Sequence, residues 1–347
     1  MKKSLWMLGM AVVALTSCTQ SEVLDIPERK VIEFDTHVNN LSRFIEKDVN
    51  VGSIEEFHVF GYLKNKETNN NYDLFFNNVK VVKDNDGSWK YVTDTEPVRY
   101  WDKFSEYHFA AYSNGLEKNH LNDNSNQNGA VEFNVTGEKD KLVFEDYKAG
   151  INDLVASIID TIKTEESIDI MDVHFNFYHM LSKVRFAFYA NTSTELQISD
   201  VTVHNAINVA DGEFVFQTDT AVWKTDTAER VDNAYISTTN RTTLSSTASY
   251  FCFYIIPQSN KDVTVSFNLH SKESENNYRT ETYTANLETK VTNHMGVWKS
   301  GCSYLYNLHF SAEDFNLIPI DFAVEAVDGW DPATSQGSSI TPELKTN

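Results

Sequence analysis

The sequence predicts an all-β protein built as two β-sandwiches in tandem, and three observations support this prediction. Apolar and polar residues alternate along most of the chain, which is the period of a strand with one buried face. Long stretches with the 3.6-residue period of an amphipathic helix are nearly absent. The chain has 347 residues, more than one sandwich usually holds, so we expect two hydrophobic cores.

The first strand is expected at residues 32–38, where the alternation is regular. One face of this strand carries Ile32, Phe34, Thr36 and Val38. The opposite face carries Glu33, Asp35 and His37. The pattern predicts a half-buried strand near the start of the folded chain.

Further strands are expected at 57–63, 79–81, 89–91, 107–111, 131–135, 142–144 and 153–157. Asp86 and Gly87 lie between two of these runs and predict a hairpin turn. The Asn-rich stretch 114–129 predicts an exposed loop. A charged stretch at 161–169 then predicts a boundary near residue 170, so the first domain is expected to span residues 18–170.

The second domain is expected to span residues 171–330. Its strands are expected at 173–177, 184–188, 201–203, 251–255, 263–269, 304–310 and 318–326. Many short strands separated by turn signals are typical of a sandwich. Residues 331–347 are polar and are expected to form a tail.

The N-terminus has the features of a lipoprotein signal. Lys2 and Lys3 precede an apolar run at residues 5–15, which is too short for the roughly 20 residues of a membrane-spanning helix. The run ends in small residues followed by Cys18, whose thiol would receive a diacylglyceryl group before cleavage just ahead of it. We therefore expect residues 1–17 to be removed and Cys18 to anchor the chain to a membrane. An ordinary signal peptide with an incidental cysteine is the alternative.

The charge excludes one class of partner. The formal net charge is −21, from 29 basic and 50 acidic residues, and it becomes about −23 when Lys2 and Lys3 are removed. Binding to nucleic acid depends on neutralising phosphates with Lys and Arg, so nucleic acid is not expected as a partner. Cys252 and Cys302 lie in strand-like runs and could form a disulfide or could equally be small core residues.

No constellation of catalytic residues or cofactor ligands emerges from the sequence, so we expect neither an enzyme nor a bound cofactor. Motifs for a nucleophilic serine, a phosphate loop or a dinucleotide fingerprint are missing. His174 and His179 are five residues apart on an expected strand, so they point to opposite faces and should not share a metal ion. Asp84 and Asp86 resemble part of a calcium loop but fit a hairpin turn better.

The order of short motifs along the chain resembles the fimbrillin family of Bacteroidales lipoproteins, the subunits of type V pili. These motifs include Phe57-His58-Val59-Phe60-Gly61, Tyr100-Trp101, Asp153-Leu154-Val155-Ala156, His179-Met180-Leu181-Ser182, Ile256-Pro257-Gln258 and Trp298-Lys299-Ser300-Gly301. The resemblance implies two transthyretin-like β-sandwich domains, export to the outer membrane, and polymerisation with other fimbrial subunits or capping of a fimbria. A host or bacterial surface ligand is a further partner that it implies.

The resemblance also implies assembly by donor-strand exchange after an Arg-specific protease removes the N-terminal strand. A cut after Arg29 would leave the strand at 32–38 in place, whereas a cut after Arg43 would release it, so Arg43 is the candidate processing site. The segment from residue 318 onwards is the expected donor, although it could also complete its own domain. If Arg43 is not cut and lies in a structural turn, the chain would serve as an anchor or minor component.

Two other classes of protein compete with a fimbrial subunit. An acidic, aromatic-rich β-protein with six Trp could bind glycans at the cell surface without polymerising. Trp89, Trp101 and Trp330 fit packing positions on strands better than exposed stacking platforms. An enzyme is the third and weakest class, because no nucleophile, base and orienting group occur together.

Overall fold

The structure, a computed structural model, describes residues 30–38, 54–66, 71–91, 97–113, 130–136, 139–166, 172–216, 220–237, 240–289, 294–311, 321–327, 338–340 and 343–344. Within these ranges every regular element is a β-strand, which confirms the predicted all-β fold. Cys18, Arg43 and Trp330 lie outside the described residues. None of the described segments forms a helix long and apolar enough to cross a membrane.

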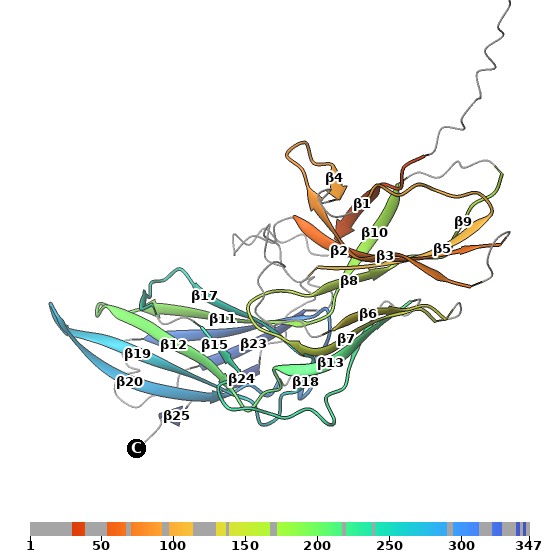
Figure 1. The fold of residues 1–347 in the computed structure, drawn as a ribbon. Helices are drawn as coiled ribbons and strands as arrows, with labels where there is room; N and C mark the ends of the chain where they lie inside the picture. Colours follow the sequence, from red (N-terminus) through yellow and green to blue (C-terminus); the bar gives the residue numbers. More distant parts are fainter. Residues whose placement is uncertain are drawn as a thin grey trace, which may run out of the picture.

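The largest sheet contains most of the strands predicted in the first half of the chain (Figure 1). Its order is β1 (Phe34–Val38), β10 (Val173–His179), β8 (Val155–Ile158), β5 (Ser105–Ser113), β2 (Glu56–Asn65), β3 (Asp73–Lys83) and β4 (Trp89–Tyr91). The short strand β9 (Ile162–Lys163) also pairs with β5. The predicted hairpin joins β3 to β4, and Gly87 adopts a φ of 88° in its turn, a left-handed conformation that favours glycine.

A four-stranded sheet packs on one face of the largest sheet. It consists of β14 (Thr220–Trp223), β13 (Val209–Val215), β7 (Lys141–Lys148) and β6 (Val131–Asn134). The ring of Tyr112 on β5 lies 5.7 Å from that of Phe144 on β7, and both side chains are buried. This contact joins the two layers into a sandwich.

Strand pairing crosses the boundary expected near residue 170. Strand β10 follows that position but belongs to the largest sheet, and β13 pairs with β7 although about 60 residues separate them. The alternation of apolar residues identifies a strand and its buried face, but it does not identify the neighbouring strand. The sequence therefore located these strands without locating their partners.

Two further sheets face each other in the second half of the chain. One has the order β17 (Ser249–Ile255), β11 (Ser182–Asn191), β22 (Ser303–Ser311), β23 (Asp321–Val327) and β24 (Ser338–Ile340). The other has the order β15 (Tyr235–Ile236), β12 (Leu196–His204), β19 (Thr264–Ser274), β20 (Asn277–Asn286) and β25 (Glu343–Leu344), with β16 (Thr242–Thr243) on β12. Phe188 on β11 and Phe267 on β19 meet edge to face at 5.2 Å between these sheets.

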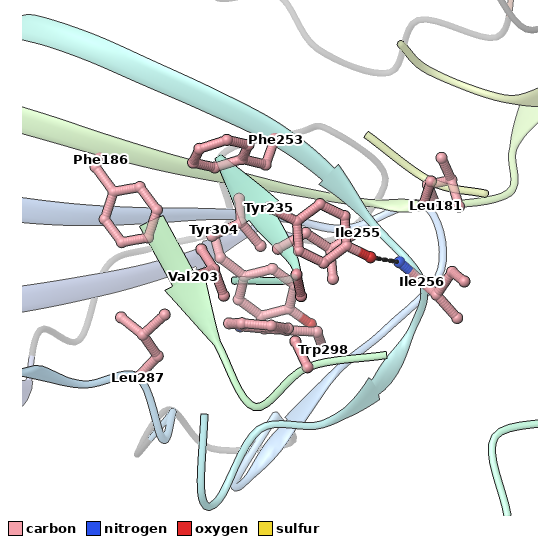
Figure 2. Packing of buried hydrophobic residues seen from close by; sticks show 14 of the residues in the cluster. Leu181, Phe186, Val203, Tyr235, Phe253, Ile255, Ile256, Leu287, Trp298 and Tyr304 are labelled. Carbon is pink, nitrogen blue, oxygen red and sulfur yellow. Dashed lines mark hydrogen bonds between the residues drawn. The ribbon is translucent and has the colours of Figure 1, made fainter. Parts of the chain in front are cut away.

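Aromatic side chains lie at one end of the packing between these two sheets, within a buried cluster that also includes residues of β5 and β7 (Figure 2). Trp298 and Tyr304 are fully buried and lie side by side, and the backbone N–H of Ile256 donates a hydrogen bond to the hydroxyl of Tyr235. Trp298 is on β21 (Val297–Trp298), which pairs with β18 (Gln258–Ser259). Two of the motifs noted in the sequence therefore serve packing at this end.

Other sequence motifs meet where β10 continues into β11. The Nδ1–H of His179 donates to Asp153 at 2.5 Å, and both side chains are largely buried. The hydroxyl of Ser300 donates to the backbone carbonyl of His179, and the indole N–H of Trp223 donates to that of Met180. The connection between the sheets is thus held by polar contacts from several distant segments.

Cys252 and Cys302 are not joined by a disulfide. Cys252 lies on β17 opposite Arg185 of β11, whereas Cys302 immediately precedes β22 on the other side of β11. Strands that flank a common neighbour are about 9–10 Å apart, which exceeds the roughly 7 Å limit for the Cα atoms of a disulfide. Of the two alternatives that the sequence left open, the structure therefore favours two small side chains in the sheet.

Candidate functional site

The N-terminal segment is held on two sides at the edge of the largest sheet. Residue Val31 forms an antiparallel bridge to Tyr100, and the N–H of Ile32 donates to the carbonyl of Arg99 at 2.9 Å. Strand β1 then pairs in parallel with β10, from Phe34 opposite Val173 onwards. Figure 1 shows β1 and β10 side by side. The segment therefore fills the space between residues 97–101 and β10, and we call this space the β1 seat.

The strand predicted at residues 32–38 is observed as β1, and the face predicted to be buried is confirmed at Ile32 and Phe34. Ile32 and Phe34 are almost completely buried, whereas Glu33 and Asp35 are exposed. Thr36 is half-buried. Because side chains alternate along a strand, each second residue of the segment enters the core while its neighbours stay in water.

Phe34 is the anchor of the segment. Its ring lies 5.3 Å from that of Phe76, 5.8 Å from that of Phe175, 6.1 Å from that of Phe109 and 6.4 Å from that of Phe57. These four rings come from β3, β10, β5 and β2. Phe34 therefore packs against strands across most of the sheet, from β10 beside β1 to β3 near the opposite edge. The sheet curves around this ring, which fills the core on its inner side.

Gly61 on β2 leaves room for two of these rings. A Cβ atom at this position would lie 2.9 Å from Cε1 of Phe109 and 3.0 Å from Cδ2 of Phe76. Real Cβ atoms are not found so close to aromatic carbons, so any larger residue would displace the rings that surround Phe34. Gly61 closes one of the motifs singled out in the sequence, and its role here is to shape the β1 seat.

The outer face of β1 makes only a weak electrostatic contact. The Oδ2 atom of Asp35 lies 3.4 Å from Nδ1 of His174 on β10, and both side chains are about half exposed. Exposed ion pairs contribute little to stability, typically about 0–1 kcal/mol. Burial of Ile32 and Phe34, at roughly 1.5–3 kcal/mol each before ordering costs, is therefore the larger attraction.

Three other candidates from the sequence do not form a ligand site. Trp101 packs against Tyr107 at 4.7 Å, and Trp89 packs against Phe57 at 4.8 Å, so neither indole is an exposed stacking platform. Asp86 accepts hydrogen bonds from the N–H and hydroxyl of Ser88 in the β3–β4 turn. Across the described part of the chain, no three His, Cys, Asp or Glu residues gather as metal ligands.

The expected donor segment is occupied within its own sheet. Strand β23 pairs antiparallel with β22, from Ser303 opposite Val327 to His309 opposite Asp321, and β24 pairs with its other edge. The sequence left open whether this segment acts as a donor or completes its own domain. In this structure β23 is paired within its own sheet, as the second alternative expects. Residues 318–320 lie outside the described residues.

Comparison with known proteins assigns the family. The sequence profile of the fimbrillin-like family matches residues 45–326, which is most of the chain. The protein therefore belongs to the fimbrillin-like family. No curated protein matches the sequence.

Several crystal structures resemble the fold at low sequence identity. A candidate cell adhesion protein of Bacteroides uniformis is 14% identical, with 87% of this chain and 98% of that chain covered and a TM-score of 0.44. A candidate cell adhesion protein of Bacteroides ovatus is 16% identical, with coverage of 86% and 98% and a TM-score of 0.47. A fimbrial assembly protein of Parabacteroides distasonis is 12% identical, with coverage of 79% and 88% and a TM-score of 0.30.

Truncating the anchor should destabilise the protein much more than truncating its exposed neighbour. We expect Phe34→Ala to lower the free energy of unfolding by about 3–5 kcal/mol, because the four surrounding rings would line a cavity. Asp35→Ala should change it by less than about 0.5 kcal/mol, because the carboxylate is exposed. Urea unfolding measures both values. Similar losses for the two variants would contradict the described seat.

Proposed function

We propose that the protein is a structural and adhesive subunit of a cell-surface fimbria, held at the outer membrane by a lipid on Cys18, in which β1 is the strand exchanged during assembly. Membership of the fimbrillin-like family supports the fimbrial class. The observation that carries the exchange is the β1 seat. A strand with a deeply buried anchor lies last in its sheet, so it can leave without breaking a pairing between other strands.

The geometry also favours Arg43 over Arg29 as the processing site. The seated segment begins at residue 30 and continues to Val38, so a cut after Arg29 leaves every contact of the seat intact. A cut after Arg43 separates the segment from the rest of the chain. While the tether is intact, the local concentration of β1 is of millimolar order, which allows it to outcompete an incoming strand of similar strength.

The chain carries the pattern of β1 a second time, in the expected donor. The two runs are Ile32-Glu33-Phe34-Asp35-Thr36 and Ile320-Asp321-Phe322-Ala323-Val324. Both have an isoleucine, an acidic residue, a phenylalanine and, two positions later, a β-branched residue. A similar run at 131–135 begins with valine, but it forms β6 in the middle of the chain and is paired with β7.

The shared spacing supports a model in which β1 leaves its seat and residues 320–324 of a second subunit bind there instead. In that register Phe322 takes the place of Phe34, and Asp321 takes the exposed place of Glu33. A shift by one residue would turn the phenylalanine to water, so the alternation excludes that register. A shift by two residues would leave the Phe34 position to Ile320 or Val324, and the shared order of residues favours Phe322 there. The contact joins different surfaces of two subunits, does not close on itself and therefore propagates a filament.

Removal of Arg43 should block assembly. We expect an Arg-specific protease to cut the purified full chain after Arg43 and to produce SDS-resistant ladders on gels. Arg29→Ala should form ladders like the unchanged protein, and Arg43→Ala should not, because its N-terminal segment stays tethered. Equal ladders from Arg43→Ala, or cut protein that stays monomeric, would overturn the proposal.

The register of the donor can be tested with peptides added to the cut protein. A labelled peptide of residues 318–328 should bind, and its Phe322→Ala version should bind more than about 100-fold more weakly, because truncating a buried phenylalanine costs about 3–5 kcal/mol. A peptide of residues 30–40 is the positive control. If that control binds and the 318–328 peptide does not, the seat is exchangeable and the assigned donor is wrong.

The anchor is tested separately in cells that process lipoproteins. The unchanged chain should incorporate labelled palmitate and sediment with membranes. Cys18→Ser should lose both properties, because the thiol that receives the lipid is missing. Palmitate incorporation that persists in Cys18→Ser would refute lipidation at this residue.

A further inference from the structure

A buried histidine lies between two carboxylates directly behind the β1 seat. His108 on β5 is 2% exposed, and its Nδ1 atom lies 2.6 Å from Oδ2 of Asp140. Its Nε2 atom lies 3.2 Å from Oε1 of Glu106. A neutral imidazole has one N–H and donates to only one of these oxygens, whereas the imidazolium ion donates to both. The geometry therefore selects the protonated form.

This cluster joins the two layers of the first sandwich. His108 and Glu106 belong to the largest sheet, and Asp140 immediately precedes β7 of the four-stranded sheet. Asp140 makes two further contacts: its Oδ1 atom accepts the N–H of Thr136 at 3.0 Å, and its carbonyl accepts the N–H of Phe216. The His108–Asp140 contact thus connects β5 to the residue that precedes β7 in the opposite layer.

The same strand carries the seat on its other face. Phe109 follows His108 directly, and its ring is one of the four around Phe34. Neighbouring residues of a strand point to opposite faces, so His108 faces the four-stranded sheet while Phe109 faces β1. A change in the position of β5 relative to the other layer therefore moves a wall of the seat.

We propose that His108, Asp140 and Glu106 form a proton-dependent latch that holds β5 against the four-stranded sheet and thereby controls how firmly β1 is retained. The proposal rests on β1 being the exchangeable strand and names a regulation of that site. With His108 protonated, both carboxylates are bonded and the layers are held together. When the proton is lost, one carboxylate faces an imidazole lone pair, and the latch opens.

The direction of the pH dependence follows from the surroundings of His108. Burial alone lowers the pKa of His108, but the hydrogen bonds and negative charges of Asp140 and Glu106 outweigh it, so its pKa is raised above the usual range. A raised pKa in the folded state adds stability below about pH 6.5, the ordinary value for histidine. That stability is lost as the pH rises through the pKa of His108 in the folded state.

The other charged and titratable groups around the latch do not reverse this direction. Tyr72, whose ring meets that of His108 edge to face at 4.9 Å, donates to Glu106, and its pKa is raised to about 12. The Nζ atom of Lys163 on β9 lies 3.9 Å from Oε2 of Glu106, and Lys64 on β2 lies over the ring of Tyr72. Because its pKa is raised, Tyr72 stays neutral from about pH 6 to about pH 9.

Hydrogen exchange of the uncut full chain tests the latch. Protection factors correct for the intrinsic pH dependence of exchange, so the protection of β1 amides can be compared with that of β12 amides at about pH 6 and about pH 9. We expect the β1 ratio to fall several-fold as the pH rises in the unchanged protein. In His108→Gln and in Asp140→Asn the ratio should be nearly independent of pH.

His174→Gln is the matched control, because His174 contacts Asp35 of β1. It should keep the full pH dependence. A pH dependence that persists in His108→Gln but disappears in His174→Gln would assign the effect to the exposed pair and overturn the latch. The change of the β1 ratio with pH is measured within each variant. A general loss of stability in a variant therefore does not obscure the result. If the latch behaves as expected and peptides still fail to replace β1, donor exchange is wrong and the latch remains.

Discussion

The packing of the Phe34 ring against four other phenylalanines is the contact on which the largest sheet depends. Those rings come from β2, β3, β5 and β10, so one side chain at the edge of the sheet fills the core enclosed by its curvature. An empty space of this size lined by aromatic carbon is costly, because the lining loses contacts and water gains nothing by entering. The seat therefore requires an occupant, whether that occupant belongs to the same chain or to another.

In β1 the groups that anchor the strand differ from the groups that pair its backbone. The attraction comes from Ile32 and Phe34, which point inward, whereas the backbone is joined to β10 on one side and to a short bridge near Tyr100. Strand β23 is different, since it is paired along both edges, to β22 and to β24. For β23 to act as a donor it must leave two neighbours, so the energy gained in a second subunit has to offset that loss.

The sequence predicted strand β1 better than it predicted the site around it. Alternation at residues 32–38 identified the strand and the burial of Ile32 and Phe34, because burial of every second residue leaves a local pattern. The parallel pairing with β10 could not be predicted, since the two strands are far apart in the chain and the pattern carries no information about partners. The same limit explains why the His108–Asp140 contact was missed: each residue alone looks like an ordinary polar position, and only the fold brings them within 2.6 Å.

The two faces of β5 show how an apolar seat can be placed under polar control. Hydrophobic packing around Phe34 is non-directional and almost independent of pH. It stabilises β1 in its seat but does not make that stability depend on pH. The charge-assisted hydrogen bonds of His108 are directional and depend on one proton. They contribute less stability than the packing around Phe34, but their contribution changes with pH. Because Phe109 and His108 are consecutive, the rigid backbone of one strand joins these two properties. Strand β5 is held by contacts on both faces. Loss of the His108 contacts on its polar face would therefore weaken its position while the phenylalanine rings on the other face stay packed.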